Sequence, residues 1–205
     1  SLEDTRYAAE LGYKIKHLGI AKKTDKGVEL RVHPTLIPEK RLLANVNGVM
    51  NAVLVRGDAV GSTLHYGAGA GAEPTASATV ADIVDTVRLI NTDAAQLVPH
   101  LGYSSQQLAE LPLLNSDDFT CAFYLRLEVG DHPGVMAEVA KTFAERSISI
   151  EAVIQKEPPA GETTAQIIML TQACLESELN QAVANIESLD SVLSSVTKIR
   201  VEHLD

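Results

Sequence analysis

The chain has 205 residues, and its hydrophobic fraction of 45% with only 4% aromatics predicts a core built mainly from aliphatic side chains. No apolar run approaches the ~20 residues that span a bilayer, and the net charge of −10 is uneven, with 11 Lys/Arg against 12 Asp/Glu over residues 1–110 but 6 against 15 over residues 111–205. An acidic second half argues against nucleic acid and anionic membranes as partners, and the change in charge hints at two domains.

Short helices and extended runs alternate along the first half. The pattern predicts a helix over residues 4–11, and it predicts strands over 14–21, 28–34, 50–55 and 59–66, with hairpin turns near residues 25–27 and 57–58. A later helix carries apolar residues at spacings of four and three, namely Ala76, Val80, Ile83, Val87 and Ile90. We therefore expect a mostly antiparallel sheet with this helix packed on it.

The most informative stretch, residues 66–74, joins the last of these strands to the helix and contains Gly67, Gly69 and Gly71. Glycines let another molecule approach the backbone closely, and Pro74 suits the first helical position, where free N–H groups face outward. Three interpretations stay open: a loop touching a ligand held mainly by another part of the protein, a purely structural turn, or a self-contained dinucleotide fold. The last is weakest, because the flanking strands look like hairpins rather than a parallel strand–helix–strand unit.

Residues 93–117 lose this periodicity and are predicted to be a linker, because Pro99 and Gly102 interrupt regular structure. Beyond the linker the pattern predicts strands and helices in the order βαββαβ, at residues 119–129, 135–143, 148–154, 164–171, 175–186 and 192–201, with a hairpin loop over 157–161. This order predicts a ferredoxin-like layer of two helices on an antiparallel sheet. The predicted fold class is therefore α+β.

The turn after the first of these strands reads Asp131-His132-Pro133-Gly134, and with the βαββαβ order it resembles the ACT domain, a small regulatory module of amino-acid enzymes. The resemblance makes these four residues the expected effector site. The N–H groups of the helix that follows suit an amino-acid carboxylate, and Asp131 could face the ammonium group, or it could equally well cap the helix. Because one such sheet exposes an edge and a face, we expect two modules to pair.

Segments of the first half, in the right order, resemble bacterial homoserine dehydrogenase, namely residues 12–21, 28–37, 51–53, 66–71, 74–78 and 81–83. The resemblance implies an oxidoreductase that interconverts L-homoserine and L-aspartate 4-semialdehyde with NAD or NADP in threonine and methionine biosynthesis. It places part of the catalytic and dimerisation domain at residues 1–92, the linker at 93–117, and a threonine-sensing ACT domain at 118–205. It also places Gly67, Gly69 and Gly71 beside the nicotinamide cofactor.

The segments that carry the family's chemistry have no match in this chain, neither the catalytic lysine segment nor the N-terminal cofactor fingerprint nor the cation loop. We expect no catalytic residue and no metal site here, a cofactor bound mainly by a preceding domain, and no dehydrogenase activity of residues 1–205 alone. The resemblance implies a cytoplasmic homo-oligomer, either a dimer or a tetramer, and we expect Cys121 and Cys174 to be reduced and buried.

Two other functions stay open: a non-catalytic amino-acid-sensing or dimerisation protein whose first half is a scaffold, and an ACT module that has lost its ligand and serves only in assembly. Among the remaining ionisable residues, His33 is the best candidate for a further site residue, because it precedes a proline at a strand end.

Overall fold

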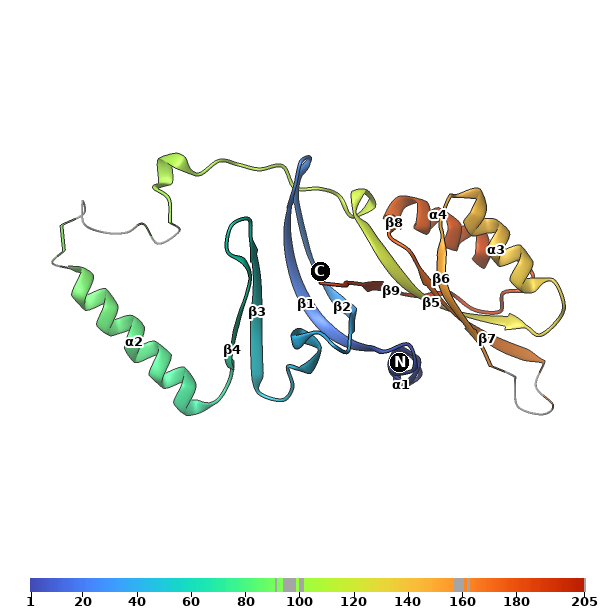
Figure 1. Cartoon of the computed structure of the whole chain (residues 1–205), viewed down its shortest axis with the longest axis horizontal. Coiled ribbons are helices and arrows are strands. Elements are labelled where there is room, and N and C mark those ends of the chain that lie inside the picture. The colour runs from blue at the N-terminus through green and yellow to red at the C-terminus, as the bar shows by residue number, and fades with distance from the viewer. Residues whose placement is uncertain (91, 94–98, 100–101, 157–160, 162, 205) are drawn as a thin grey trace. The chain divides into compact units, whose positions relative to one another are not determined.

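The computed structural model describes residues 1–90, 92–93, 99, 102–156, 161 and 163–204. Contacts divide the chain into two compact units, one made of residues 1–44 with 111–205 and the other of residues 45–110. The first unit holds a seven-stranded sheet and the second a two-stranded one (Figure 1). The domain boundaries at residues 92 and 118 follow the family resemblance rather than these contacts, and they stay a prediction.

The large sheet has the strand order β1-β2-β9-β5-β7-β6, with β8 paired to β5 off this path. Its strands are β1 (Tyr13–Thr24), β2 (Gly27–Pro38), β5 (Thr120–Gly130), β6 (Ile150–Gln155), β7 (Thr164–Thr171), β8 (Cys174–Leu175) and β9 (Thr197–Val201). The helices of this unit are α1 (Leu2–Glu10), α3 (Val135–Glu145) and α4 (Glu176–Glu187), with 3-10 turns η1 (Leu42–Asn45) and η4 (Ser116–Asp118).

The predicted ferredoxin-like module is confirmed from β5 onward, with two small differences. A short strand, β8, precedes α4, and β9 begins five residues later than expected, because the segment before it makes only an isolated bridge between Val192 and Val129. The predicted loop over residues 157–161 lies outside the described residues except for Gly161.

Hydrophobic clusters fill both faces of this sheet. Figure 1 shows α3 and α4 side by side on one face. Alternate β5 side chains point toward them, as the period of two predicts: Cys121, Phe123, Leu125, Leu127 and Val129. On the opposite face Ala8 of α1 packs in a cluster with Leu36 and Tyr124, each with none of its surface exposed. Both faces of β5 are covered, and seven of its eleven residues are accordingly apolar.

The first half of the chain extends this sheet. Strand β2 pairs with β9 in parallel, Thr35 opposite Arg200 and Leu36 opposite Val201, and the Glu202 N–H donates to the Leu36 carbonyl at 2.9 Å. The same chain therefore occupies the β9 edge of the ACT module and part of the open face on which the sequence predicts pairing with a second module. Strand β6 forms the other edge of the sheet, and pairing between modules stays a prediction.

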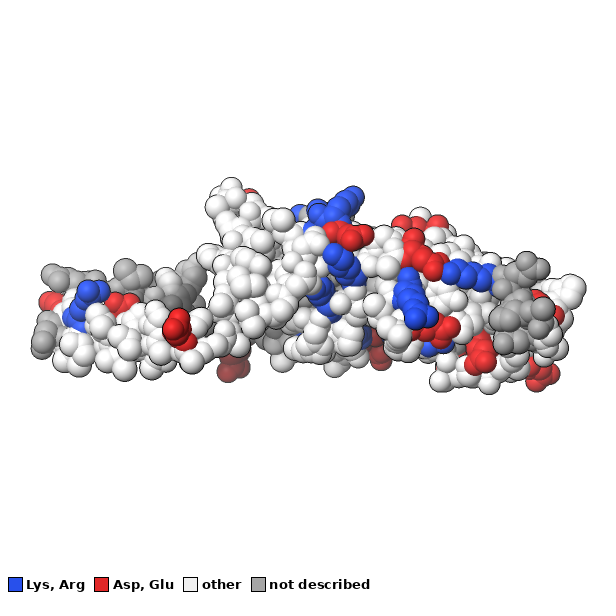
Figure 2. Space-filling model, turned by 90° about the horizontal axis from the view of Figure 1, so that it is seen from below, with Lys and Arg blue, Asp and Glu red and all other residues white. Residues whose placement is uncertain are grey.

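The second unit consists of the predicted hairpin, β3 (Met50–Gly57) and β4 (Gly61–Ala68), followed by α2 (Ala72–Ile90) and the 3-10 turn η3 (Ser105–Gln107). The expectation that α2 packs its apolar stripe on the sheet is wrong for this chain, because none of its residues is buried and Ile83 and Val87 are 58% and 59% exposed. The hairpin also leaves Val53 exposed. Figure 2 shows acidic and basic side chains interspersed among uncharged ones on the face that it draws.

No helix within the described residues combines the length and the hydrophobicity needed to cross a bilayer. Within the predicted linker over residues 93–117, residues 94–98, 100 and 101 lie outside the residues that the structure describes.

Candidate functional site

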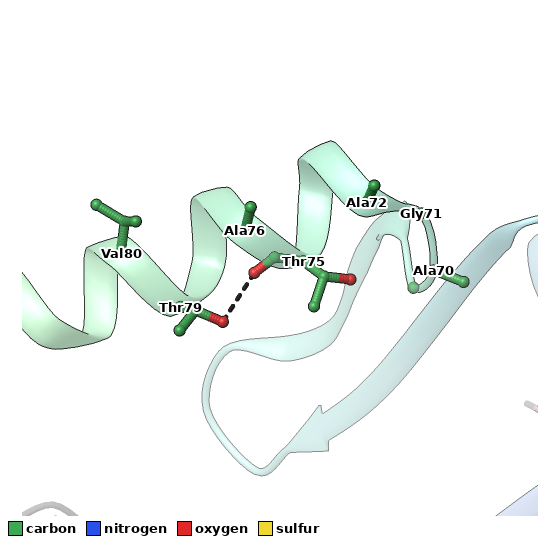
Figure 3. Close-up of a pocket in the computed structure, with 8 residues that line it drawn as sticks. Ala70, Gly71, Ala72, Thr75, Ala76, Thr79 and Val80 are labelled. Atoms are coloured by element: carbon green, nitrogen blue, oxygen red, sulfur yellow. Dashed lines mark hydrogen bonds between the residues drawn. The ribbon is translucent and has the colours of Figure 1, made fainter.

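The glycine loop between β4 and α2 borders an open hollow of about 800 Å³ (Figure 3). The Gly69 N–H donates to the Val49 carbonyl at 3.0 Å, and the Gly71 carbonyl accepts the Thr75 N–H at 3.2 Å, which is a first bond of the helix. The helix starts at Ala72, two residues before the start predicted at Pro74. Pro74 still lies within the first turn, where its missing N–H costs no intrahelical hydrogen bond.

The three predicted glycines have different physical settings. A Cβ atom at Gly69 would overlap the Asn51 side chain of β3, and Gly71 has a φ of +120°, which L side chains rarely adopt. A Cβ atom at Gly67 would meet no atom within 4 Å among the described residues. Contact with the hairpin therefore explains the need for glycine at 69, and the positive φ explains it at 71, whereas Gly67 borders open space.

The walls of this hollow are small and mostly apolar. Ala72, Ala76 and Val80 lie along one side of α2, and Thr75 and Thr79 lie beside them (Figure 3). The Thr79 hydroxyl is engaged, because it donates to the Thr75 carbonyl at 2.9 Å. The lining contains neither Lys nor Arg, and Glu73 lies in the first helical turn. Such walls suit the face of a flat, uncharged ring better than a phosphate group.

The second predicted site, the turn between β5 and α3, is anchored at both ends. The Gly130 N–H donates to the Ser191 carbonyl and the Asp131 N–H to the Thr163 carbonyl, both at 2.8 Å. Gly134 is the N-cap of α3 with a φ of +104°, and no side chain caps this helix. The alternative in which Asp131 caps α3 is therefore wrong, because the backbone conformation of Gly134 starts the helix without it.

This turn lines a hollow of about 470 Å³, to which all four predicted effector residues contribute. Its walls also contain Val129, Val135, Met136, Gln155 and Ile167. The His132 ring lies beside Gly130, where an added Cβ would come within 3.2 Å of it, and Asp131 is exposed. The site thus combines the free N–H groups of the α3 N-terminus, an exposed carboxylate and an apolar wall.

A buried polar contact that the sequence analysis missed fixes α1 to the sheet. Asp4 is only 2% exposed, and its Oδ1 accepts hydrogen bonds from Arg126 Nε at 2.7 Å and from the Tyr124 hydroxyl at 3.1 Å. Burial alone would raise the pKa of Asp4, but hydrogen bonds from Arg126 and from the Ser1 hydroxyl outweigh it and hold this pKa well below its usual range. The signal in the sequence is Arg126, a cation in a strand of mostly apolar residues.

A second buried carboxylate ties α4 to the sheet. Glu176, the first residue of α4, is 2% exposed and accepts two hydrogen bonds from Arg200, at 2.5 and 2.9 Å, with Lys198 at 3.4 Å. Its role is structural, because these partners are all side chains of β9.

His33, the further candidate from the sequence, lies half-buried on β2 and lines neither hollow. Its Nδ1 lies 3.0 Å from the Thr35 hydroxyl. Burial lowers the pKa of His33, and the nearby charges of Arg200 and Arg31 act in the same direction. A role for His33 as a further site residue stays a prediction.

The fold and the two hollows define a two-part chain, a regulatory module of the ACT type joined to a hairpin and helix with a glycine loop. Residues 1–84 match the family model of homoserine dehydrogenase, and residues 125–194 match that of the AHAS small subunit-like ACT domain. Both parts therefore match known families in the order in which they occur along the chain.

Curated relatives match through both parts. The homoserine dehydrogenase of Pseudomonas aeruginosa is 52% identical over 202 residues, and that of Neisseria gonorrhoeae is 53% identical over 201 residues. Each alignment covers 98% of this chain and 46% of the relative.

Solved structures of homoserine dehydrogenases also match the chain through both parts. A homoserine dehydrogenase from Thiobacillus denitrificans matches with a TM-score of 0.90 at 55% identity, over 99% of this chain and 46% of that one. The S. aureus enzyme at pH 6.0 matches with a TM-score of 0.62 at 26% identity, over 100% of this chain and 45% of that one. The chain belongs to the homoserine dehydrogenase family, corresponds to its C-terminal portion, and spans somewhat less than half the length of these relatives.

Proposed function

We propose that the full-length protein containing this chain is a homoserine dehydrogenase, which interconverts L-homoserine and L-aspartate 4-semialdehyde with NAD or NADP in threonine and methionine biosynthesis. The observation that carries the proposal is an identity of 52–53% that extends over 98% of the chain. An unrelated scaffold fused to an ACT module would not align through both parts at this level. We further propose that the protein is a cytoplasmic homo-oligomer, a dimer or a tetramer.

In this proposal the glycine loop borders the nicotinamide ring, which supplies or accepts the hydride when the cofactor is bound. Gly67 leaves space for close approach, and the small side chains of α2 present a flat wall. The lining offers no cation for the cofactor's diphosphate. We therefore propose that most of the cofactor is bound by the other half of the full-length protein, which this chain does not include. The residues present fit the ring end of NAD or NADP and not its phosphates.

The exposed apolar stripe of α2 also indicates that the other half of the protein contacts this region. A helix with an apolar stripe gains stability in water when another surface buries that stripe, yet Val80, Ile83, Val87 and Ile90 are all more than half exposed. Because the relatives are about twice as long as this chain, we propose that the other half of the protein covers this stripe. The glycine loop at the start of α2 would then lie beside that half.

The turn between β5 and α3 is the proposed effector site, and threonine is the proposed effector. The carboxylate of an amino acid would accept hydrogen bonds from the free N–H groups at the start of α3, and Asp131 would face the ammonium group. Because Asp131 does not cap the helix, its carboxylate is available for this role. Inhibition then requires that threonine bind one of two arrangements of the assembly more tightly than the other.

An activity assay of the full-length protein tests the proposal. We expect oxidation of NADPH or NADH, followed by absorbance, that depends on L-aspartate 4-semialdehyde and saturates in both substrates. Residues 1–205 alone should give no turnover. Full-length protein that is folded but inactive with both cofactors would contradict the proposal and favour a non-catalytic sensor, and turnover by the isolated chain would contradict the assignment of the chemistry to the other half.

A further inference from the structure

The two cysteines of the chain, distant in sequence, lie directly opposite each other in the structure. Cys121 of β5 is the register partner of Cys174 in β8, and both are free thiols. Cys121 belongs to the hydrophobic cluster beneath α3 and α4, and Cys174 packs against the same cluster. The two thiols therefore lie on the same face of the sheet with no third cysteine to compete for either one.

The spacing of this pair follows from the hydrogen bonds of the ladder. The Glu176 N–H donates to the Phe119 carbonyl at 2.8 Å, two residues along from the cysteines, which makes Cys121 and Cys174 a hydrogen-bonded pair with Cα atoms about 5.5 Å apart. Disulfides form across Cα separations of about 4.4–6.8 Å, but their Cβ atoms must approach to about 3.8 Å, and a bond that distorts its surroundings is more easily reduced. The register therefore permits a bond that is also readily broken.

We propose that Cys121 and Cys174 form a reversible intramolecular disulfide when the chain meets a low-molecular-weight disulfide such as oxidised glutathione. The half-buried Cys174 reacts first, because Cys121 is only 5% exposed. The Cys174 thiolate attacks one sulfur of the oxidant, forms a mixed disulfide and releases one small thiolate. Cys121 then loses its proton and attacks the Cys174 sulfur, which releases the second small thiolate.

Atoms and electrons balance in this exchange. The two protein thiols lose two electrons and two protons, and one molecule of oxidant becomes two small thiols. Burial raises the pKa of Cys121 to about 12 and also raises the pKa of Cys174. Little thiolate is therefore present near neutral pH, and the rate of disulfide formation should increase as the pH rises.

The bond would act on a defined part of the fold. Cys174 lies two residues before Glu176, whose carboxylate holds Arg200 and Lys198 of β9. A covalent link from Cys174 to β5 would fix the start of α4 to the centre of the sheet. Because the link closes a loop of about 50 residues, it should stabilise this unit against unfolding. Formation of the bond requires only the chain itself and does not depend on dehydrogenase activity.

Thiol counting on purified residues 1–205 tests the proposal. After incubation of the native chain with oxidised glutathione at about pH 8, we expect both thiols to be lost, a mass lower by about 2 Da, and a monomer on a non-reducing gel. The melting temperature should rise by about 5 °C, and dithiothreitol should reverse every change. Cys121→Ser and Cys174→Ser should each prevent the mass loss of about 2 Da.

Three results would overturn the proposal. They are a disulfide-linked dimer, a lasting glutathione adduct on Cys174, or two unreacted thiols in native chain that oxidise once urea is added. Circular dichroism of both serine variants separates a failure to fold from a failure to oxidise. If one variant is misfolded, peptide mapping of the oxidised wild-type chain decides by the presence or absence of the Cys121–Cys174 cross-link.

Discussion

Gly67, Gly69 and Gly71 look alike in the sequence but differ in what surrounds them. Only Gly69 lies against the Asn51 side chain, and only Gly71 of the three adopts a positive φ. Gly67 has neither constraint among the described residues, and we propose that the open space beside it admits the cofactor. Two substitutions of equal size can therefore separate a structural glycine from a functional one.

We expect Gly69→Ala to destabilise residues 1–205 by about 1–3 kcal/mol, because the new methyl group overlaps Asn51. Gly67→Ala should leave the free energy of unfolding within about 0.5 kcal/mol of the wild type. In the full-length protein, Gly67→Ala should raise the KM for NAD(P)H about tenfold, which corresponds to about 1.4 kcal/mol. Urea unfolding measures the change in stability, and steady-state kinetics measure the KM. An unchanged KM in Gly67→Ala would contradict the proposal that the loop borders the cofactor.

Asp4 makes a pH-dependent contribution to stability. Its pKa in the folded chain is depressed below the unfolded value of about 3.9. The contribution is therefore fully present above that value and is lost as the pH falls through the folded pKa. Asp4→Asn should cost about 3 kcal/mol at neutral pH, because it leaves Arg126 without its buried partner.

Urea unfolding of the wild type and Asp4→Asn over a pH series checks this prediction, and the difference between them should shrink below about pH 4. Glu3→Gln is the matched control. Glu3 lies 3.6 Å from Arg126 but its side chain is 46% exposed, so its loss should cost less than about 1 kcal/mol. A difference between wild type and Asp4→Asn that stays constant down to low pH would contradict the account.

At the scale of elements, the junction of β2 with β9 joins the first half of the chain to the ACT module. Leu36 has no exposed surface and packs with residues of α1, β5 and β9, whereas Val32 of the same strand is 71% exposed. Leu36→Ala should therefore cost about 2–5 kcal/mol, and Val32→Ala less than about 0.5 kcal/mol. Thermal and urea unfolding of both variants test this, and equal effects would mean that the junction does not form.

Substitutions in the apolar stripe of α2 should have different effects on the stability of the isolated chain and of the full-length protein. The double substitution Ile83→Ser and Val87→Ser changes two exposed side chains, so it should alter the unfolding of residues 1–205 by less than about 1 kcal/mol. In the full-length protein we expect a loss of about 2 kcal/mol or more, because both side chains would be buried against the other half. Urea unfolding curves of both proteins test this prediction. A neutral effect in both would contradict it, because it would mean that the stripe is also exposed in the full-length protein.

Local patterns predict the elements well, because they depend on neighbours in the sequence. Alternation along β5, the turn glycines and the apolar spacing of α3 and α4 are enough to predict the ferredoxin-like order that the fold adopts. The contacts of α1 and of β2 with the module join segments more than a hundred residues apart, and no local pattern encodes such pairs. The stripe of α2 is visible in the sequence, but amphipathicity shows only that a face needs cover, not which surface covers it.

The candidate sites show the same limit. The glycine loop and the turn at Asp131 can be located from the sequence, because glycine clusters and a strand–turn–helix order are local signals. The side chain of Asn51, from another strand, determines which glycine has space for a Cβ atom. The backbone of Gly134 determines whether Asp131 caps α3. Cys121 and Cys174 have no recognisable spacing in the sequence, and only the pairing of β5 with β8 brings them together.

At the scale of the whole molecule, we propose that this chain senses an amino-acid effector and borders the cofactor site, and that the other half of the full-length protein carries out the chemistry. The most direct test is a calorimetric titration of L-threonine into purified residues 1–205. We predict saturable binding that Asp131→Ala weakens at least about tenfold, with the fold of the variant verified by circular dichroism. The absence of any binding heat in a folded chain, or equal binding by Asp131→Ala, would contradict it.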